Sequence, residues 1–332
     1  MNYSQLSKHR SELMGMAIVG ILFCHFKECL VIHQKAVPYF ADLLSRGICG
    51  VDIFMVVSGI GVFYSFTKDK NVINFYRKRL ARLIPTYLII GGTYWIINNF
   101  LIGHQKIICF LEDLFFISFF KKGTSIFWYV PAIIIFYLVF PLIYDYLTDT
   151  RIFPGISVGI KTLILLMFAV VCDFLLSCFL SIYHNITIMT GRFPAFIIGV
   201  YYGYKSYHNH PCSIAGLIIF PGIKIILHFL YRIPAAEQIL CKFNVHYLDT
   251  LMALLLIEVF IVFINFVRIR QLENVLNLYG GITLEVYLFH MALLNLSGNP
   301  ADAAVYFLIC AAAPTAGGFL LHKYLNTLLK SG

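Results

Sequence analysis

The sequence predicts an all-α integral membrane protein, built as a bundle of about ten transmembrane helices. Of its 332 residues, 60% are hydrophobic and only 12% are charged, and the mean hydropathy is +0.82. Soluble globular domains carry about 25% charged residues, so this composition excludes an ordinary soluble protein. No long polar stretch separates the apolar runs, and we expect a single transmembrane domain over residues 1–332 without an appended soluble domain.

Ten apolar runs are candidates for membrane spans, because a spanning helix needs about 20 mainly apolar residues. These runs cover residues 12–32, 43–66, 83–102, 126–147, 157–182, 190–206, 213–231, 246–267, 279–297 and 303–322. The polar start MNYSQLSKHRSEL leads directly into the first run without a cleavage site of small residues. We therefore expect the first span to be retained.

The segment 107–120 is ambiguous, because it is short and carries Glu112 and Asp113. We interpret it as an interfacial or re-entrant helix. The alternate loops on one side of the membrane then hold fifteen Lys and Arg residues, and those on the other side hold eight. Basic residues mark the cytoplasmic side, which predicts a multi-pass protein of the inner (plasma) membrane with both termini in the cytoplasm. We attribute the net charge of +9 to this topology and expect no nucleic-acid binding.

Missing motifs exclude several classes of function. The nine cysteines form no CxxC pair, so a structural zinc site has no support and we expect no metal. The patterns GxxxxGK[ST], GxGxxG, HExxH and GxSxG do not occur. Nucleotide-driven pumping, dinucleotide redox chemistry and hydrolase-type catalysis lose support accordingly.

The first span carries ionisable side chains in its second half, at His25, Lys27 and Glu28. Charge is costly inside a membrane, so such residues indicate a functional site. His25 and Glu28 are three residues apart and project from the same helical face. An imidazole oriented by a carboxylate suits a general base that takes a proton from a hydroxyl. The alternative is a structural histidine that hydrogen-bonds to a neighbouring span.

The run GVDIFMVVSGIGVF, residues 50–63, places Asp52 and Ser58 inside the second span. A carboxylate at Asp52 needs a polar partner in this low-dielectric setting. Gly59 and Gly61 lack side chains, and we expect them to let another helix backbone approach closely.

The run NFYRKRLARLIPTYL, residues 74–88, is strongly basic just before the third span. It contains Arg77, Lys78, Arg79 and Arg82. Arg79 and Arg82 share a helical face, and guanidinium groups bind phosphates through paired hydrogen bonds. This cluster is a candidate site for a phosphorylated donor. The alternative is a topology anchor that touches anionic lipid.

Other polar and aromatic side chains are candidates for supporting roles. Trp128 lies in FWYVPAIIIFYLVFP, residues 127–141, whose aromatic start is typical of an interfacial belt. Arg192 lies at the end of a span in GRFPAFIIGVYYG, and we expect it to face outward. Glu285 and His290 lie in the ninth span, five residues apart, so we expect each to meet groups on other helices.

In this order the motifs resemble the membrane-bound acyltransferase 3 family, the O-acyltransferases that modify bacterial surface glycans. The resemblance covers nearly the whole chain. It rests on MGMAIVGILFCH, GVDIFMVVSGIGVF, FYRKRLARLIPTYL, FWYVPAIIIFYLVFPLI and GITLEVYLFH.

The resemblance implies an O-acetyltransferase that uses acetyl-CoA, or another acyl-CoA, as co-substrate and a glycan or lipid-linked sugar as acceptor. The family's first-span histidine, proposed as catalytic, corresponds to His25. Its cytoplasmic R-x-x-R, thought to engage the acyl-CoA, corresponds to Arg79 and Arg82. The family often has an arginine eleven positions before the histidine, where this chain has Met14. Arg10 lies one helical turn earlier and is a candidate to reach a similar place.

The depth of His25 suits a reaction across the membrane. At 1.5 Å per residue it lies about 20 Å beyond Glu12, past the midplane of a hydrocarbon core about 30 Å thick. A group at this depth can meet an acyl donor from the cytoplasm and an acceptor hydroxyl from the other side. His25 either deprotonates that hydroxyl or carries the acyl group itself. Glu28, Asp52 and Glu285 are candidates to orient its ring.

The main alternative is a multi-span transporter or flippase for a sugar or lipid intermediate. The same intramembrane charges would then form a proton relay or a substrate site. A non-catalytic membrane scaffold or sensor is a third possibility. Arg79 and Arg82 distinguish an acyltransferase from a transporter, because a transporter has no obvious need for a phosphate-binding R-x-x-R. His25 distinguishes it from a scaffold, which should tolerate the loss of this histidine.

Overall fold

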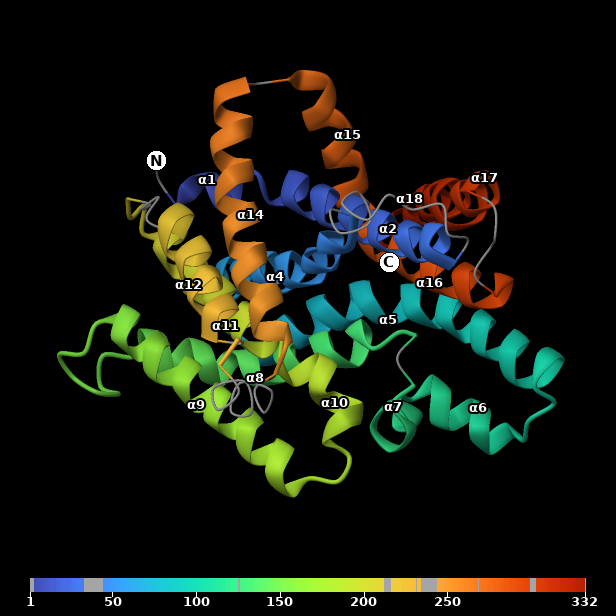
Figure 1. Cartoon of the computed structure of the whole chain (residues 1–332), viewed down its shortest axis with the longest axis horizontal. Coiled ribbons are helices and arrows are strands. Elements are labelled where there is room, and N and C mark those ends of the chain that lie inside the picture. Colours follow the sequence, from blue (N-terminus) through green and yellow to red (C-terminus); the bar gives the residue numbers. More distant parts are fainter. Residues whose placement is uncertain are drawn as a thin grey trace.

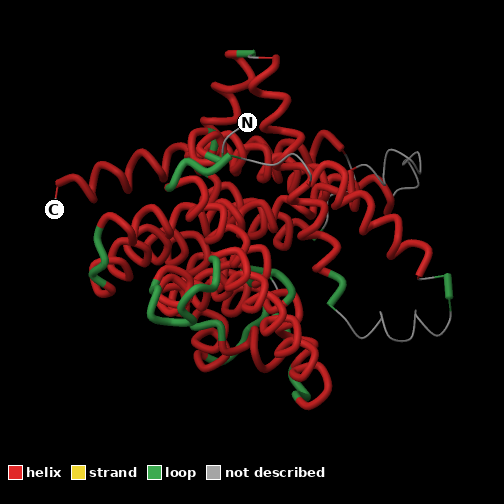
Figure 2. Tube along the Cα trace, turned by 90° about the vertical axis from the view of Figure 1, so that its left-hand side faces the viewer, coloured by secondary structure: helices red, strands yellow, loops and turns green. Residues whose placement is uncertain are grey.

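The computed structural model describes residues 3–32, 44–124, 126–211, 216–230, 232–233, 244–267, 269–298 and 303–331. Within these residues the chain is helical and forms no β-strand (Figures 1 and 2). This confirms the predicted all-α class. The physical reason is that a helix satisfies its backbone hydrogen bonds within one segment, as an environment without water requires.

The described residues of the N-terminal half form ten helical elements. They are α1 (Ser4–Lys8), α2 (Arg10–Ile32), η1 (Arg46–Cys49), α4 (Gly50–Lys68), α5 (Val72–Ile96), η2 (Ile97–Ile102), α6 (Ile107–Leu114), α7 (Ile117–Lys122), α8 (Tyr129–Thr148) and α9 (Val158–Phe179). The short η1 leads directly into α4, and η2 continues α5 as a π-helical extension.

The C-terminal half continues with further helices on both sides of the same core. They are α10 (Tyr183–Thr190), α11 (Phe193–Tyr207), α12 (Gly216–Leu230), α14 (His246–Val267), α15 (Arg270–Gly281), α16 (Thr283–Ser297), α17 (Ala303–Tyr306), η3 (Phe307–Ala312) and α18 (Ala313–Ser331). Helix α15 packs along α2, and α16 packs against α5 and α18.

Five helical segments of the described chain are long and apolar enough to cross a bilayer. They are Arg46–Lys68, Val72–Ile102, Tyr129–Thr148, Val158–Phe179 and His246–Val267. The remaining five predicted spans overlap α2, α11, α12, α16 and the segment from η3 to α18. The architecture is that of a multi-pass membrane protein, whereas the number of ten spans stays a prediction.

The segment 107–120 does not form a spanning helix. The structure divides it between α6 and α7, because Phe116 adopts a left-handed backbone conformation with φ 63°. The Phe116 ring packs 4.6 Å from that of Tyr87. Glu112 accepts hydrogen bonds from Lys121 and Lys122 at 2.9 and 3.1 Å, and these bonds hold the pKa of the Glu112 carboxyl below its usual range.

Helix α4 lies at the centre of the molecule (Figure 1) and packs against α2, α5, α8, α11 and α14. Its closest neighbour is α11, and glycines make this approach possible. A Cβ atom on Gly59 would lie 2.5 Å from the carbonyl oxygen of Phe196, and one on Gly199 would overlap the carbonyl of Val56. The expectation for Gly59 is thus confirmed. Gly61 instead borders a cavity, where an added Cβ would meet only Arg10 Nη1, at 3.5 Å.

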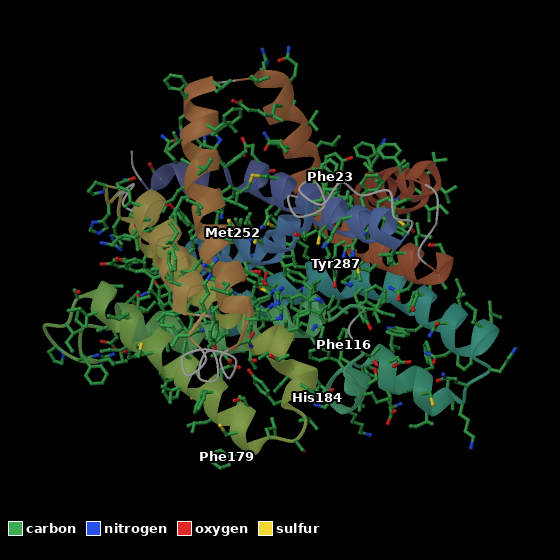
Figure 3. All side chains as sticks on the ribbon, in the orientation of Figure 1. Phe23, Phe116, Phe179, His184, Met252 and Tyr287 are labelled. Carbon is green, nitrogen blue, oxygen red and sulfur yellow. The ribbon has the colours of Figure 1, made fainter. Side chains whose placement is uncertain are left out.

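Peripheral helices expose apolar side chains, as expected of surfaces that face lipid. Phe179 at the end of α9 is 85% exposed and lies at the edge of the molecule, whereas Tyr287 is buried near its middle (Figure 3). The candidate functional side chains are therefore expected in the interior, around the central helix α4.

The tight contact between α4 and α11 is tested by Gly199→Ala. The added methyl group meets the α4 backbone, which cannot yield as a flexible side chain can, so we expect a loss of about 1–3 kcal/mol in the free energy of unfolding. Thermal unfolding in detergent measures the change. Gly222→Ala in α12 is the matched control, because nothing lies within 4 Å of a Cβ atom there. Equal stability of the two variants would contradict the packing described.

Candidate functional site

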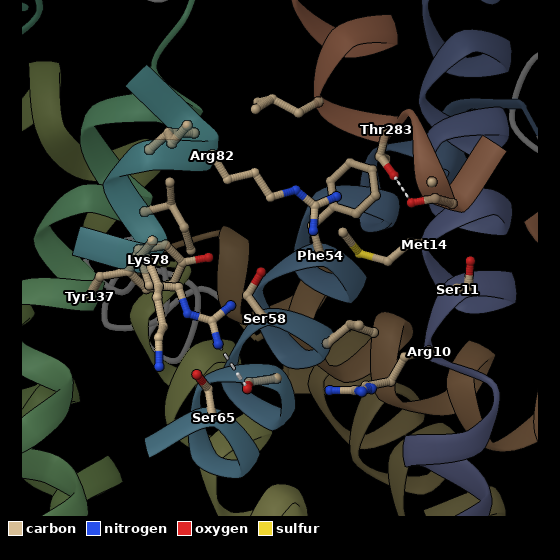
Figure 4. Close-up of a pocket in the computed structure, with 18 of the residues that line it drawn as sticks. Arg10, Ser11, Met14, Phe54, Ser58, Ser65, Lys78, Arg82, Tyr137 and Thr283 are labelled. Atoms are coloured by element: carbon tan, nitrogen blue, oxygen red, sulfur yellow. Dashed lines mark hydrogen bonds between the residues drawn. The ribbon is translucent and has the colours of Figure 1, made fainter. Parts of the chain in front are cut away.

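A cavity of about 710 Å³ lies between α2, α4, α5, α8 and the junction of α15 with α16 (Figure 4). We call it the basic cavity, because its lining includes the cationic side chains of Arg10, Lys68, Lys78, Arg79 and Arg82. None of the lining residues that the structure describes is acidic. An anion is therefore the ligand that this lining favours.

One face of α4 forms a continuous wall of the basic cavity. The wall consists of Phe54, Val57, Ser58, Gly61, Tyr64, Ser65 and Lys68. These positions recur at spacings of three and four residues and so lie on a single side of the helix. The wall runs about 21 Å from Phe54 to Lys68 at 1.5 Å per residue. Ser58, Gly61 and Ser65 are small, which leaves room in its middle.

Helix α5 brings three of its four predicted cations to the cavity. Lys78, Arg79 and Arg82 line it, whereas Arg77 is exposed and is not among the lining residues. Arg79 is held in place by its Nη2, which donates to the carbonyl oxygen of Gly61 at 3.1 Å. Its guanidinium carbon also lies 5.7 Å from the centre of the Phe75 ring, within the range of a cation–π contact.

The start of α5 is fixed by local hydrogen bonds. Asn71 caps the helix by accepting from the backbone amide of Asn74 at 3.0 Å. Asp69, two residues earlier, accepts from the Lys78 ammonium at 3.0 Å. This bond holds the pKa of the Asp69 carboxyl below its usual range. The basic end of the cavity is thus attached to the loop between α4 and α5.

Arg10 reaches the same cavity from α2. Its Nε donates to the carbonyl of Ser7 at 3.2 Å, and its guanidinium carbon lies 5.6 Å from the centre of the Tyr64 ring. Met14 lines the cavity one helical turn further on. The structure therefore places Arg10 and Met14 on one wall, and Arg10 supplies the positive charge that Met14 does not.

Three aromatic side chains line the cavity beside the first half of α4, and one of them, Tyr129, lies close enough to Arg82 to interact with it electrostatically. Tyr129 lies 6.0 Å from Phe54 and 5.6 Å from Tyr287, measured between ring centres. Tyr129 hydrogen-bonds to the side chain of Ser58. Tyr287 donates from its hydroxyl to the carbonyl of Ile126 at 3.2 Å. We call Phe54, Tyr129 and Tyr287 the aromatic end.

His25 lies beyond this cavity and does not line it. It follows Met14 by eleven residues, on the same face of α2 and about 16 Å further along the helix axis. Along α16 the distance from the cavity lining to the next histidine is shorter, because His290 follows the lining residue Tyr287 by a single turn. The rings of His25 and His290 lie 5.1 Å apart. The two imidazoles thus form a pair just past the aromatic end.

Two of the three carboxylates expected to orient His25 have other partners. Glu285 contacts Nδ1 of His322 at 2.9 Å, and Asp52 contacts Arg192. The side chain of Glu28 lies outside the described part of the chain. The expectation that Glu285 and His290 meet other helices is confirmed, since His322 belongs to α18 and His25 to α2.

Arg192 corrects one expectation from the sequence, because its side chain is fully buried rather than outward-facing. Its Nε lies 3.6 Å from Asp52, and its Nη2 lies 3.9 Å from Asp249. A buried guanidinium requires compensating charge, which these two carboxylates supply. Thr250 donates to Asp52 at 2.7 Å, and His246 contacts Asp249 at 3.0 Å.

Trp128 requires a second correction. Its ring is not part of an interfacial belt but is buried beneath Arg192, with the guanidinium carbon 4.9 Å from the ring centre. This cation–π contact replaces hydration that Arg192 loses on burial. Trp128 immediately precedes Tyr129, so the charged group centred on Arg192 lies directly behind the aromatic end.

Several lining residues were not singled out from the sequence. Among them are Lys68, Tyr64, Tyr137 and Tyr287. The stripe of small and polar residues on α4 is the signal that could have revealed the cavity. The partners of Arg192 and Glu285 come from helices far apart in the sequence, and no local pattern indicates them.

The compensation of Arg192 is tested by Arg192→Met. This change leaves Asp52 without its cation, and breaking a buried ion pair costs about 3–5 kcal/mol. We expect Asp52→Asn to recover part of this loss when combined with it. Arg151→Met is the matched control, because that guanidinium pairs with Asp149 while 90% exposed and is worth at most about 1 kcal/mol. Thermal unfolding in detergent compares the wild type, the two single arginine variants and the double variant. Similar losses of stability for Arg192→Met and Arg151→Met would contradict a buried, charged Arg192.

Comparison with known proteins identifies the family of this chain. A family model described as an acyltransferase domain matches residues 13–323. No curated protein and no solved structure matches the chain. The matched region includes His25, the α4 wall and the cations of α5. This chain therefore belongs to the acyltransferase 3 family of membrane acyltransferases.

Proposed function

We propose that the protein moves an acyl group, most simply an acetyl group, from cytoplasmic acyl-CoA to a hydroxyl of a cell-surface or lipid-linked glycan. The observation that carries this proposal is the basic cavity, whose lining combines five cationic side chains with the rings of Phe54, Tyr129 and Tyr287 and has no acidic member among the described residues. Acyl-CoA offers matching chemistry, because its phosphates bind cations and its thin uncharged arm carries the thioester.

The cations define the donor's orientation. Phosphate groups would lie against Arg79, Arg82 and Lys78, with Arg10 opposite them. Guanidinium groups suit this role because they bind phosphate oxygens through two parallel hydrogen bonds. The uncharged arm would follow the wall of α4 past Ser58 towards the aromatic end. From Gly61, which binds Arg79, to Phe54 this wall runs about 10 Å, and the arm would cover this length to reach the aromatic end.

His25 would act where donor and acceptor meet. In direct transfer it takes the proton of the acceptor hydroxyl while the hydroxyl oxygen attacks the thioester carbonyl. In covalent transfer its ring nitrogen carries the acyl group before the hydroxyl does. Either route requires the arm to pass Tyr287 into the turn of α16 that bears His290.

The distribution of basic residues supports a cytoplasmic position for the basic end of the cavity. The cavity's cations belong to the N-terminal segment, the loop between α4 and α5 and the start of α5, which the charge distribution assigns to the cytoplasm of an inner (plasma) membrane protein. Acyl-CoA is then available at the basic end. The acceptor glycan would approach His25 from the opposite side, through a protein with both termini in the cytoplasm.

Donor binding is tested with the double variant Arg79→Ala/Arg82→Ala in detergent. Each charge-assisted hydrogen bond contributes about 1.5–3 kcal/mol, so we expect acetyl-CoA affinity, measured by calorimetry, to fall at least about 100-fold. Arg77→Ala is the matched control, one residue away but exposed and outside the cavity. A wild-type protein that does not bind acetyl-CoA at millimolar concentration would eliminate the donor assignment and favour a transport role for the buried charges.

The catalytic assignment is tested separately with His25→Ala. We expect acetyl-CoA to bind as in wild type, because His25 does not line the cavity, while slow thioester hydrolysis falls about 10²–10⁴-fold. Hydrolysis is followed by release of the free thiol. Wild-type rates in His25→Ala would remove this residue from the chemistry.

Cavity occupancy can be tested without changing charge, by Gly61→Leu. The new Cβ makes an ordinary contact with Arg10 Nη1, and the rest of the side chain would occupy part of the cavity beside α4, so we expect acetyl-CoA affinity to fall at least about tenfold by steric exclusion. Its unfolding temperature should stay near that of wild type, because the added Cβ makes only an ordinary contact. Unchanged affinity would show that the ligand binds elsewhere.

A further inference from the structure

His290 occupies an enclosed position in α16, with 0% of its surface exposed. It follows Tyr287 of the aromatic end by one helical turn and so lies on the same side of the helix. The planes of the His25 and His290 rings meet at 45°, with their centres 5.1 Å apart. Among the described side chains, His290 is therefore a direct neighbour of the proposed catalytic group.

A hydrogen bond to the backbone fixes which nitrogen of His290 carries the proton. Nδ1 lies 2.5 Å from the carbonyl oxygen of Cys310. A carbonyl oxygen can only accept, so Nδ1 is the donor and holds a hydrogen. In the neutral ring Nε2 then holds a lone pair and is an acceptor.

The sequence explains why the Cys310 carbonyl meets a side chain. In an α-helix this oxygen would accept from the amide four residues later, but residue 314 is a proline and has no N–H. The backbone forms the π-helical turn η3 (Phe307–Ala312) at this point. Such turns are frequent at functional sites, and this one directs a carbonyl at His290.

The same turn also holds α2 beside His25. The hydroxyl of Tyr306, the residue before η3, donates to the carbonyl of Leu22 at 2.8 Å, one helical turn ahead of His25. The Tyr306 ring lies 5.3 Å from Phe26, which follows His25 directly, and 6.2 Å from His290. Both imidazoles are thus fixed relative to one backbone element.

We propose that His290 is a positioning residue for His25, and that during the reaction Nε2 of His290 accepts a hydrogen bond from one ring nitrogen of His25. The structure brings the two rings together without itself forming this bond. The other nitrogen of His25 is then the base that faces the substrates. This assignment rests on the proposed function. It assigns to a neutral imidazole the role that a carboxylate has in many catalytic triads, which is to orient the base and stabilise its protonated form.

The proton balance is complete within this arrangement. His25 takes the proton of the acceptor hydroxyl as the hydroxyl oxygen bonds to the thioester carbonyl carbon. The carbon–sulfur bond then breaks, and the leaving thiolate takes that proton from the His25 imidazolium. His290 keeps its Nδ1 hydrogen, donated to Cys310, throughout the cycle.

Two amide substitutions separate positioning from simple structural support. The amide of His290→Gln reaches the place of Nε2 and can still accept from His25. The amide of His290→Asn reaches only the place of Nδ1 and can keep only the bond to Cys310. The assay is single-turnover hydrolysis of acetyl-CoA with water as acceptor, with acetyl-CoA affinity measured in parallel.

We expect His290→Gln to stay within about tenfold of the wild-type rate and His290→Asn to lose at least about 100-fold, both with wild-type affinity. The reverse order would show that the Cys310 bond alone matters, and it would overturn the proposal. In a His25→Ala background neither substitution should lower the residual rate further. An undiminished effect there would overturn it as well.

A measurement on the wild-type protein avoids dependence on variants that fold poorly. In ¹⁵N-histidine-labelled protein we expect His290 to show a protonated Nδ1 and an unprotonated Nε2, and the Nε2 signal to shift in His25→Ala. A protonated Nε2 in neutral His290 would overturn the proposal. These spectra need no acyl-CoA, so a failure of the proposed donor would leave the histidine pair to be judged on its own.

Discussion

A charge inside a membrane must be compensated, and this requirement organises the interior of the protein. The chain meets it in two different ways within a short distance. Arg192 is enclosed and compensated by its own protein, through Asp52, Asp249 and the face of Trp128. Arg10, Arg79 and Arg82 border the basic cavity without a carboxylate among its described lining residues, whereas Lys78 pairs with Asp69 outside the lining. The first arrangement holds helices together, and the second leaves positive charge available to a ligand.

Helix α4 connects these two arrangements because its sides serve different purposes. One side carries the stripe from Phe54 to Lys68 that forms the cavity wall. Another carries Gly59, which lets α11 approach to backbone contact and so brings Arg192, at the start of α11, towards Asp52. A side chain at Gly59 would therefore alter more than local packing. It would move the buried guanidinium that lies behind Tyr129 and Trp128.

The sequence predicted the helical class, the membrane setting and the cations of α5, because each depends on local composition or on spacing within one helix. It also predicted that 107–120 does not span. It did not predict that His290 lies beside His25. Glu28 stays a prediction, because its side chain lies outside the described part of the chain, whereas His290 reaches His25 only through the packing of α16 on α2. Arg192 and Trp128 were misplaced for a related reason, since position at the end of a span says nothing about which helix will cover it.

The cations of the basic cavity come from segments that are separate in the sequence, the beginning of α2, the end of α4 and the beginning of α5. Like charges held together repel one another, and this repulsion opposes the packing of those helices. A polyanion in the cavity would reverse the sign of that force and draw the three segments together. The donor would then complete the fold as well as supply the acyl group, and the protein would be most compact when it is ready to react.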